Sequence, residues 1–316
     1  MDRLRPSSLE TGRLLLAVFA AALGSVVLAG GARAAGYEPG LIAFTRSDGI
    51  YVMRQDGTGV RPLRRGGAAA SAYGLDWSPD GRRLVFASYG SGAAEIWVMN
   101  ADGSRPVRLV SGSALMSPTW SSDGRTIAYT TYADGNRDIW MVNADGSRVR
   151  RLARTPTLFE LDVDWSPGGG RLAFSTDGYF PHLYAMRTSG RDLRRLTPRG
   201  METAGPRWSP DGRRIVFMRL GESNLEDEIY VLESRGRARV QLTRNHVMDY
   251  APVWSPDGSS IAFLRSTGES CWFQCPVPRR GSSEIYVMNA DGTNVKRLTT
   301  NAVAEGSLAW QPGAAP

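Results

Sequence analysis

Short runs of β-branched and aromatic residues recur along the chain, separated by polar stretches. One run follows a tight-turn sequence, as in Leu84-Val85-Phe86, and a second run comes soon after it, as in Ile96-Trp97-Val98. Short alternating runs of this composition favour β-strands over amphipathic helices, whose apolar positions recur at a longer period. The stretches between them are rich in Gly, Pro, Asp and Asn, which form turns. The pattern therefore predicts short antiparallel strands joined by hairpins.

A tryptophan followed by a turn motif marks each cycle of this pattern. The motif reads Trp-Ser-Pro-Asp-Gly or a close variant, and its copies begin at Trp77, Trp120, Trp165, Trp208 and Trp254, with a degenerate copy at Trp310. These tryptophans are 43, 45, 43, 46 and 56 residues apart, a period typical of four-stranded propeller blades. Proline at the second turn position and glycine at the fourth suit a tight turn. Methionines that recur in the cycles, such as Met99 and Met141, are expected to pack between blades.

The two ends of the chain complete each other. The apolar runs at residues 41–44 and 50–53 lack a preceding strand and tryptophan, whereas Leu308-Ala309-Trp310 forms an isolated first strand. Pairing them gives a sixth blade and removes the open sheet edges. The predicted fold is all-β: a six-bladed β-propeller of four-stranded antiparallel blades, closed by N- and C-terminal strands that share one blade.

The start of the chain is expected to be a targeting segment. Arginines precede an apolar run at residues 14–28, and Ala32-Arg33-Ala34 follows it. This order matches a secretory signal peptide with an A-x-A cleavage site, although the apolar stretch is nearly long enough for an uncleaved membrane anchor. We predict a signal peptide at residues 1–34 and a propeller at residues 35–316. The mature protein is expected in the periplasm, or secreted or associated with the cell wall, without stable membrane insertion.

The charge of the chain does not indicate a nucleic-acid partner. The formal net charge is +7, and the basic residues are arginines except Lys296. They occur singly or in pairs such as Arg64-Arg65. A nucleic-acid-binding surface needs a basic stripe and a recognisable reading module, and the sequence contains neither. We therefore expect solvated surface charge.

The order of motifs within each cycle resembles a known family. The cycle W-S-P-D-G, I-A-F, I-Y-V-M-N-A-D-G, R-L-T is similar to the WD-like repeat of the TolB propeller family over nearly all of residues 41–312. The blade that begins at Trp165 departs from this pattern, because Gly168-Gly169-Gly170 replaces Asp-Gly. The resemblance implies an extracytoplasmic propeller that docks protein partners, as TolB does with a peptidoglycan-associated lipoprotein.

Two further domains known from similar proteins are expected to be missing. TolB carries an α/β domain ahead of its propeller, whereas in this sequence residues 35–40 alone separate the expected signal peptide from the first strand. Similar propellers also precede the hydrolase domain of prolyl oligopeptidases and dipeptidyl-peptidases. This sequence stops at Pro316, soon after its closing strand, so no catalytic domain is expected.

Residues suited to catalysis are scarce. No G-x-S-x-G elbow occurs, and His182 and His246 are the two histidines of the sequence. A nucleophilic serine needs an adjacent base, and pectic-oligomer lyases with similar repeats hold their metal with several histidines. We therefore expect no catalysis and no resident cofactor.

The two cysteines, Cys271 and Cys275, lie in one insertion rich in Gly, Ser and Pro. In an oxidising compartment we expect them to form a local disulfide. A lone C-x-x-x-C pair is a weak basis for zinc, which takes four ligands in structural sites.

Positions that vary between cycles are candidate binding residues, because the blade does not require them. The loop that enters each innermost strand is expected at one mouth of the central channel. Five residues before the tryptophans stand Ala72, Leu115, Glu160, Thr203, Asp249 and Glu305. Nearby acidic, aromatic and imidazole side chains are Asp162, Glu202, Tyr73, Phe159, His246 and Tyr250.

We predict from these positions an acidic channel mouth that binds an Arg/Lys-rich peptide, an amine or a divalent cation. The alternative is that arginines and water neutralise the carboxylates. The predicted function is a monomeric binding module for an extracytoplasmic protein or peptide. One alternative is a metal-dependent enzyme that acts on a carbohydrate or small molecule in the channel, and another is a structural wall or surface protein.

Overall fold

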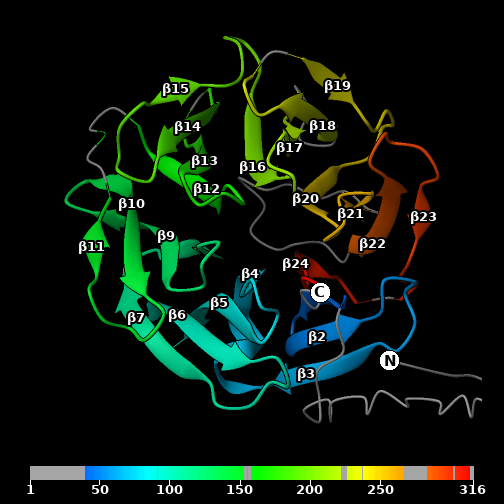
Figure 1. The fold of residues 1–316 in the computed structure, drawn as a ribbon. Coiled ribbons are helices and arrows are strands. Elements are labelled where there is room, and N and C mark those ends of the chain that lie inside the picture. The colour runs from blue at the N-terminus through cyan, green and yellow to red at the C-terminus, as the bar shows by residue number, and fades with distance from the viewer. Residues whose placement is uncertain are drawn as a thin grey trace, which may run out of the picture. The chain divides into compact units, whose positions relative to one another are not determined.

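The propeller predicted from the repeat is present. The computed structural model describes residues 40–313 except 91, 153–154, 156–157, 179, 222–225, 237, 267–282 and 302. Within these residues, 24 strands form six four-stranded antiparallel sheets arranged around a common axis (Figure 1). The predicted fold class is confirmed. The expected signal peptide and the predicted disulfide between Cys271 and Cys275 lie outside the described residues.

The six blades are named A to F in chain order, and the strands of each follow in order from axis to rim. Blade A contains β24 (Gly306–Trp310), β1 (Ile42–Arg46), β2 (Gly49–Met53) and β3 (Arg61–Arg65). Blade B contains β4 (Ala72–Trp77), β5 (Arg83–Gly90), β6 (Ala93–Asn100) and β7 (Val107–Gly112). Blade C contains β8 (Met116–Trp120), β9 (Thr126–Ala133), β10 (Asn136–Asn143) and β11 (Arg150–Arg151).

The second half of the ring repeats this order. Blade D contains β12 (Glu160–Trp165), β13 (Arg171–Thr176), β14 (Leu183–Arg187) and β15 (Arg194–Arg195). Blade E contains β16 (Thr203–Trp208), β17 (Arg214–Arg219), β18 (Glu228–Glu233) and β19 (Arg239–Gln241). Blade F contains β20 (Asp249–Trp254), β21 (Ser260–Ser266), β22 (Ser283–Asn289) and β23 (Lys296–Arg297). A short 3-10 helix, η1 (Gly67–Ser71), precedes β4, and no helix in the described part of the chain is long and apolar enough to span a bilayer.

Blade A is completed by the C-terminal strand. β24 pairs antiparallel with β1, with Ile42 opposite Trp310. The backbone N–H of Gln311 donates to the Leu41 carbonyl oxygen at 2.8 Å, and its side-chain amide donates to the Gly81 carbonyl oxygen of blade B at 2.8 Å. The predicted closure of the ring by both termini is therefore confirmed.

The Trp-Ser-Pro-Asp-Gly turns are held by their own side chains. In blade B, Ser78 Oγ donates to Asp80 Oδ1 at 2.6 Å, and the Arg83 backbone N–H donates to Ser78 Oγ at 2.8 Å. Gly81 has a φ of +65°, a left-handed conformation that glycine adopts without steric cost. The same Ser-to-Asp hydrogen bond recurs in blades C, E and F. The aspartate of the motif therefore stabilises its own turn.

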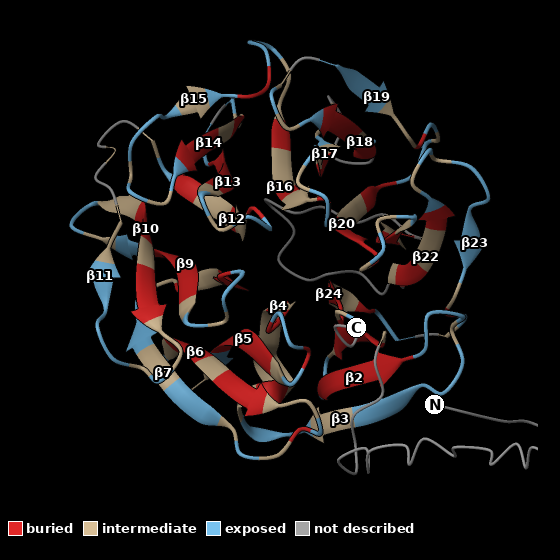
Figure 2. Ribbon diagram, in the orientation of Figure 1, coloured by how far each residue is buried: buried red, intermediate tan, exposed pale blue. Residues whose placement is uncertain are grey.

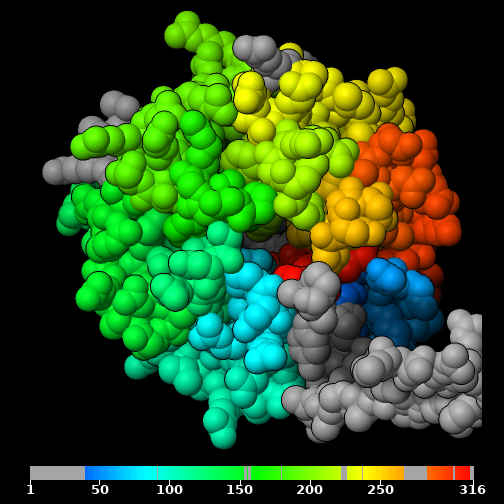
Figure 3. All heavy atoms as spheres, viewed as in Figure 1, coloured from blue at the N-terminus to red at the C-terminus, as the bar shows by residue number. Residues whose placement is uncertain are grey.

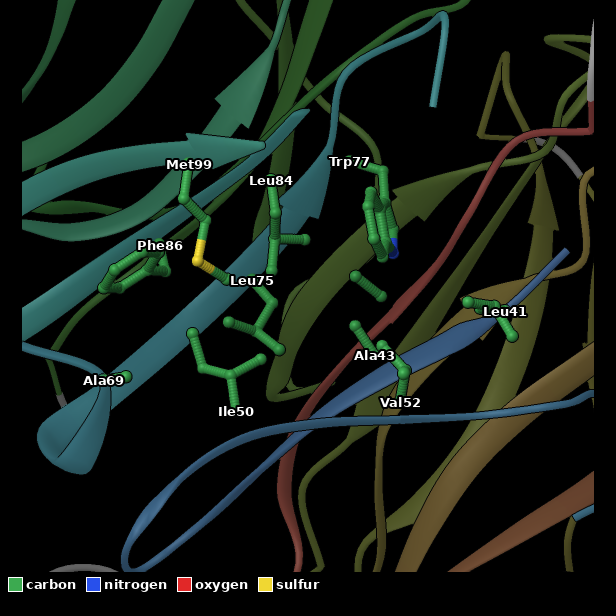
Figure 4. Close-up of a cluster of buried hydrophobic side chains, with 11 residues drawn as sticks. Leu41, Ala43, Ile50, Val52, Ala69, Leu75, Trp77, Leu84, Phe86 and Met99 are labelled. Carbon is green, nitrogen blue, oxygen red and sulfur yellow. The ribbon is translucent and has the colours of Figure 1, made fainter. Parts of the chain in front are cut away.

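Apolar side chains fill the space between neighbouring blades. Between blades A and B, the buried side chains of Ile50, Val52, Trp77, Leu84 and Phe86 pack together (Figure 4). Burying each such side chain contributes about 1.5–3 kcal/mol. The inner strands are largely buried and the outermost strands exposed (Figure 2). The methionines expected between blades are buried, as Met99, Met141, Met186 and Met288 show.

Candidate functional site

The two faces of the ring carry different connections. The innermost strands all begin at one face, which we call the loop face because the links between blades and the hairpins between second and third strands lie there. The opposite turn face carries the Trp-Ser-Pro-Asp-Gly and Asn-Ala-Asp-Gly turns. The blades pack closely around the axis (Figure 3). The predicted channel-mouth positions stand at the start of the innermost strands: Ala72, Leu115, Glu160, Thr203, Asp249 and Glu305.

Asp249 is held by a paired arginine inside blade F. Arg265 Nε and Nη2 donate to its two carboxylate oxygens at 2.6 and 2.7 Å, and Asn245 Nδ2 donates at 2.8 Å. The Arg265 guanidinium also lies 4.8 Å from the ring centroid of Tyr286. This bidentate, stacked ion pair neutralises the Asp249 carboxylate.

The same arrangement recurs one blade further on. Arg46 Nη2 and Asn301 Nδ2 donate to Glu305 Oε1 at 2.9 and 2.7 Å, and Thr299 Oγ1 donates to Oε2 at 2.9 Å. The Arg46 guanidinium lies 4.8 Å from the ring centroid of Tyr51. Glu305 is therefore also an ion-paired side chain of the blade interior.

Glu160 occupies the equivalent position in blade D without an arginine opposite it. Its register partner on β13 is Thr176. Its Oε1 atom accepts a hydrogen bond from Thr155 Oγ1, and its Oε2 atom has no partner among the described residues. Burial raises the pKa of Glu160 to about 8; Asp138 adds to this effect and Arg151 opposes it. Glu160 is therefore mostly protonated at neutral pH.

The open acidic mouth expected from the sequence is wrong for these three residues. Glu160, Asp249 and Glu305 are only 1%, 0% and 2% exposed. Each belongs to a different blade and has its own partners. Among the residues that the structure describes, no three His, Cys, Asp or Glu side chains are grouped so as to hold a metal ion. Arginine neutralisation accounts for Asp249 and Glu305, since a buried carboxylate is costly without a paired cation.

Two predicted aromatic contacts also point into the structure. The Tyr73 hydroxyl donates to the Leu115 carbonyl oxygen at 2.8 Å. The Tyr250 hydroxyl donates to Ser283 Oγ at 2.5 Å. Both hydroxyls join neighbouring elements of the ring, so these tyrosines have structural partners.

Asp162 stands at a bulge that all six innermost strands share. The residue three positions before each tryptophan has a positive φ, as seen at Gly74, Ser117, Asp162, Gly205, Ala251 and Ser307. Asp162 accepts hydrogen bonds from Ser117 Oγ at 3.1 Å, Ser175 Oγ at 2.9 Å and the Gly205 N–H at 3.3 Å. It therefore links blades C, D and E.

A second polar set, which was not predicted from the sequence, lies directly before the tryptophans. Asp76 Oδ2 accepts hydrogen bonds from the Trp120 backbone N–H at 2.7 Å and from Thr119 Oγ1 at 3.1 Å. Asp164 Oδ2 accepts one from the Trp208 backbone N–H at 2.7 Å. The axis-facing edge of an innermost strand has no further strand to pair with, so its N–H groups need other acceptors. These two aspartates supply them.

Burial also changes the acidity of these two carboxyl groups. It raises the pKa of Asp76 to about 7, with Asp164 adding to the shift, and it raises the pKa of Asp164. Arg207 opposes both shifts. The residue directly before the tryptophan differs between blades, and comparing Asp76, Thr119, Asp164, Arg207, Val253 and Ala309 would have revealed this set.

Large apolar side chains are exposed in two sets among the described residues. The rim set recurs once per blade at or beside the start of the outermost strand: Val60, Val107, Val149, Leu193, Val240 and Val295. The loop-face set is not shared by all blades, although Tyr89 and Tyr132 stand at equivalent repeat positions, as do Val247 and Val303. It comprises Tyr89, Tyr132, Phe159, Phe180, Val247 and Val303. Of the sequence-predicted residues, Phe159 and His246 are exposed on this face, and Glu202 is half-buried.

Comparison with solved structures identifies the propeller type. TolB from Acinetobacter baumannii superposes with a TM-score of 0.72 at 20% identity, over 86% of this chain and 67% of that chain. A putative TolB from Agrobacterium tumefaciens superposes with a TM-score of 0.67 at 22% identity, over 86% of this chain and 92% of that chain. The fold is that of a TolB-like propeller.

Two curated relatives match shorter stretches of this TolB-like propeller. An uncharacterized peptidase, YuxL, of Bacillus subtilis (strain 168) is 43% identical over 70 residues, which are 21% of this chain and 11% of that protein. The Tol-Pal system protein TolB of Anaeromyxobacter dehalogenans (strain 2CP-C) is 37% identical over 71 residues, 22% and 16% of the two chains. No family model matches the sequence. The predicted resemblance to TolB propellers is confirmed, while the matches cover a minor part of each curated relative.

Proposed function

We propose that this TolB-like propeller is an exported binding module that docks a protein or peptide on its loop face and catalyses no reaction. The loop-face set carries the proposal, because the repeat does not require these exposed apolar side chains. Tyr89 on blade B and Phe180 on blade D are 61% and 69% exposed. Tyrosine and phenylalanine are enriched in protein interfaces, where a few buried aromatic anchors supply most of the binding energy.

The surface around the loop-face set includes part of the sequence prediction. Phe159, His246 and Glu202 remain candidates for contacts with the partner. We no longer include Glu160, Asp249 and Glu305 among the candidate contact residues, because these side chains are buried and their hydrogen-bond partners lie inside the blades. The partner is therefore expected to depend on apolar contact more than on the cationic charge inferred from the sequence.

Docking can be tested with matched triple variants. The loop-face variant carries Tyr89→Ser, Tyr132→Ser and Phe180→Ser, and the rim variant carries the serine replacements at Val107, Val149 and Leu193. Each protein is immobilised, exposed to an envelope extract and analysed by quantitative mass spectrometry. Proteins retained by the wild type and the rim variant, but lost with the loop-face variant, would support docking. Equal retention by both variants, with unchanged melting temperatures, would place the binding surface elsewhere.

Export is supported by the N-terminal sequence pattern and by similarity to a protein named for the Tol-Pal system. Expression of the full chain, followed by fractionation and N-terminal sequencing, tests it. We expect a processed protein beginning at Ala35 outside the cytoplasm. An unprocessed cytoplasmic chain would contradict the proposal.

An enzyme is the second candidate function, because Asp76 and Asp164 lie on the innermost strands near the axis of the ring. Two neighbouring carboxyl groups with raised pKa are common in acid-base sites, and Asp76 and Asp164 have this property. Elemental analysis of the purified protein separates the two functions. A stoichiometric transition metal lost in an Asp76→Asn variant would favour the enzyme over the binding module.

A further inference from the structure

An arginine-lined pocket opens on the turn face between blades D and E, opposite the loop-face set. Its volume is about 640 Å³, and its lining includes Arg171, Arg187, Arg194 and Arg235 together with Trp208. This volume lies within the range of small-molecule sites. The pocket is independent of the proposed docking surface.

The departure of blade D from the repeat explains why the pocket is basic. Blades B and E carry Asp80 and Asp211 in their turns, where each aspartate interacts electrostatically with the arginine three residues later. Blade D has Gly168 at this position, and Gly168 lines the pocket. The turn of blade D therefore supplies no carboxylate to offset the charge of Arg171.

The arginine after the turn also takes a different position in blade D. In blade B, Arg83 lies over the next blade's Trp120, 4.5 Å from the ring centroid, and blade E repeats this contact at 4.6 Å. In blade D, Arg171 Nη2 instead donates to Asp192 Oδ2 at 2.6 Å. Trp208, the equivalent of Trp120, contributes to the pocket lining. The junction between blades D and E is thus open, whereas an arginine fills the corresponding junctions that follow blades B and E.

Two buried guanidinium nitrogens of the pocket residues have no acceptor in the described part of the chain. They are Arg171 Nη1 and Arg194 Nε. Arg194 Nη2 is satisfied, since it donates to the Ser234 carbonyl oxygen at 2.8 Å. Burial and the neighbouring Arg171 and Arg235 charges lower the pKa of Arg194. Both the unpaired donors and the cation repulsion favour a bound anion.

The charge balance points to an anion with more than one negative charge. Four arginines line the pocket, against Asp211 in the lining and Asp192, which pairs with Arg171 and Arg187. The Asp211 Oδ1 atom is occupied by Ser209 Oγ at 2.5 Å. A phosphate monoester carries a charge of about −1.5 to −2 near neutral pH. It matches the surplus of two arginines and accepts paired hydrogen bonds from guanidinium groups.

We propose that this pocket binds a phosphate group, with Arg171 and Arg194 as its main donors and Trp208 beside any organic part of the ligand. The group belongs either to free phosphate or to a small phosphorylated molecule. Titration calorimetry of the purified full-length protein at low salt uses inorganic phosphate, glucose 6-phosphate and glucose as probes. We expect both phosphates to bind and glucose not to bind. Tighter binding of glucose 6-phosphate identifies a phosphorylated molecule, and equal binding identifies free phosphate.

Three variants test the assignment to this pocket. Arg194→Gln should weaken phosphate binding about tenfold or more, because it removes a charge-assisted donor. Gly168→Asp introduces the turn carboxylate that blades B, C, E and F carry and should weaken binding similarly. A Cβ atom at Gly168 meets no atom within 4 Å, so this variant is expected to fold. Arg83→Gln in blade B is the matched control and should bind as the wild type does.

Several outcomes would overturn the proposal. These are the absence of binding by both phosphates, glucose binding as strong as phosphate binding, and phosphate binding that Arg194→Gln and Gly168→Asp leave unchanged. An equal loss in Arg83→Gln would show non-specific attraction to arginine charge. Melting temperatures of the variants confirm that each protein is folded in the titrations.

Discussion

Asp249 and Glu160 begin equivalent innermost strands, in blades F and D, and both are buried. Arg265 forms a bidentate ion pair with Asp249, whereas Thr176 stands opposite Glu160. The Asp249 carboxylate is thereby neutralised by a cation, and Glu160 is kept mostly neutral by a proton, with its pKa raised to about 8. The repeat determines where the two side chains lie. The residue opposite each one determines whether its carboxyl group is ionised and paired with a cation or is kept neutral by a proton.

The largest expected effect comes from breaking the Asp249 ion pair. Arg265→Met keeps much of the apolar stem but leaves the Asp249 carboxylate buried without its cation. The free energy of unfolding should fall by about 3–5 kcal/mol at pH 7. Urea denaturation measures this change. A loss below about 1 kcal/mol, the range of surface ion pairs, would mean that the Asp249 carboxylate does not depend on the Arg265 cation, and would contradict the contrast drawn with Glu160.

A change of opposite sign is expected at Glu160. Its folded pKa of about 8 lies above the unfolded value, so its contribution to stability is complete at low pH and is lost as pH rises toward 8. Glu160→Gln should therefore stabilise the protein by on the order of 2 kcal/mol at pH 7 and leave it nearly unchanged at pH 4. Denaturation at both pH values measures the difference.

Asp249→Asn is the matched control for Glu160→Gln. It leaves Arg265 without its carboxylate partner and should lower stability at pH 7. Removing the negative charge is therefore expected to change stability in opposite directions at the two sites. The same sign for both variants at pH 7 would contradict the comparison.

The smallest effect is expected from the asparagine that supports the ion pair. Asn245 Nδ2 donates to Asp249 Oδ2 at 2.8 Å, and its Oδ1 accepts the Val247 N–H at 2.9 Å. Asn245→Ala should cost about 1–2 kcal/mol, since hydrogen bonds to charged groups are stronger than neutral ones. His246→Ala, at the exposed neighbouring position, should stay within about 0.5 kcal/mol. Equal effects in thermal or urea denaturation would show that the amide does not support Asp249.

The fold was predictable because each blade repeats its own turn and strand signals. The Ser-Pro-Asp-Gly turns set the period, and the leftover strand at Leu308-Ala309-Trp310 matched the strand missing at the N-terminus. These signals are local, and neighbouring blades pack through the same apolar positions. The count of six blades therefore followed from the chain alone.

The direction of the loop-face carboxylates was not predictable in the same way. The positive-φ bulge three residues before each tryptophan interrupts the strand's alternation, so counting residues does not give the side-chain direction. The neutralising arginine also lies on the next strand. Comparing the position eleven residues after each tryptophan would have found it, since Arg265 stands there in blade F and Thr176 in blade D.

The closing pair of strands also determines how the ring responds to tension. Ile42, the first residue of β1, lies opposite Trp310, the last residue of β24. A force that pulls the two ends of the propeller apart loads this pair at one end. Its hydrogen bonds then break one after another, as in a zipper, instead of sharing the load in shear. Blade A is thus the mechanically weak point at which the ring would open.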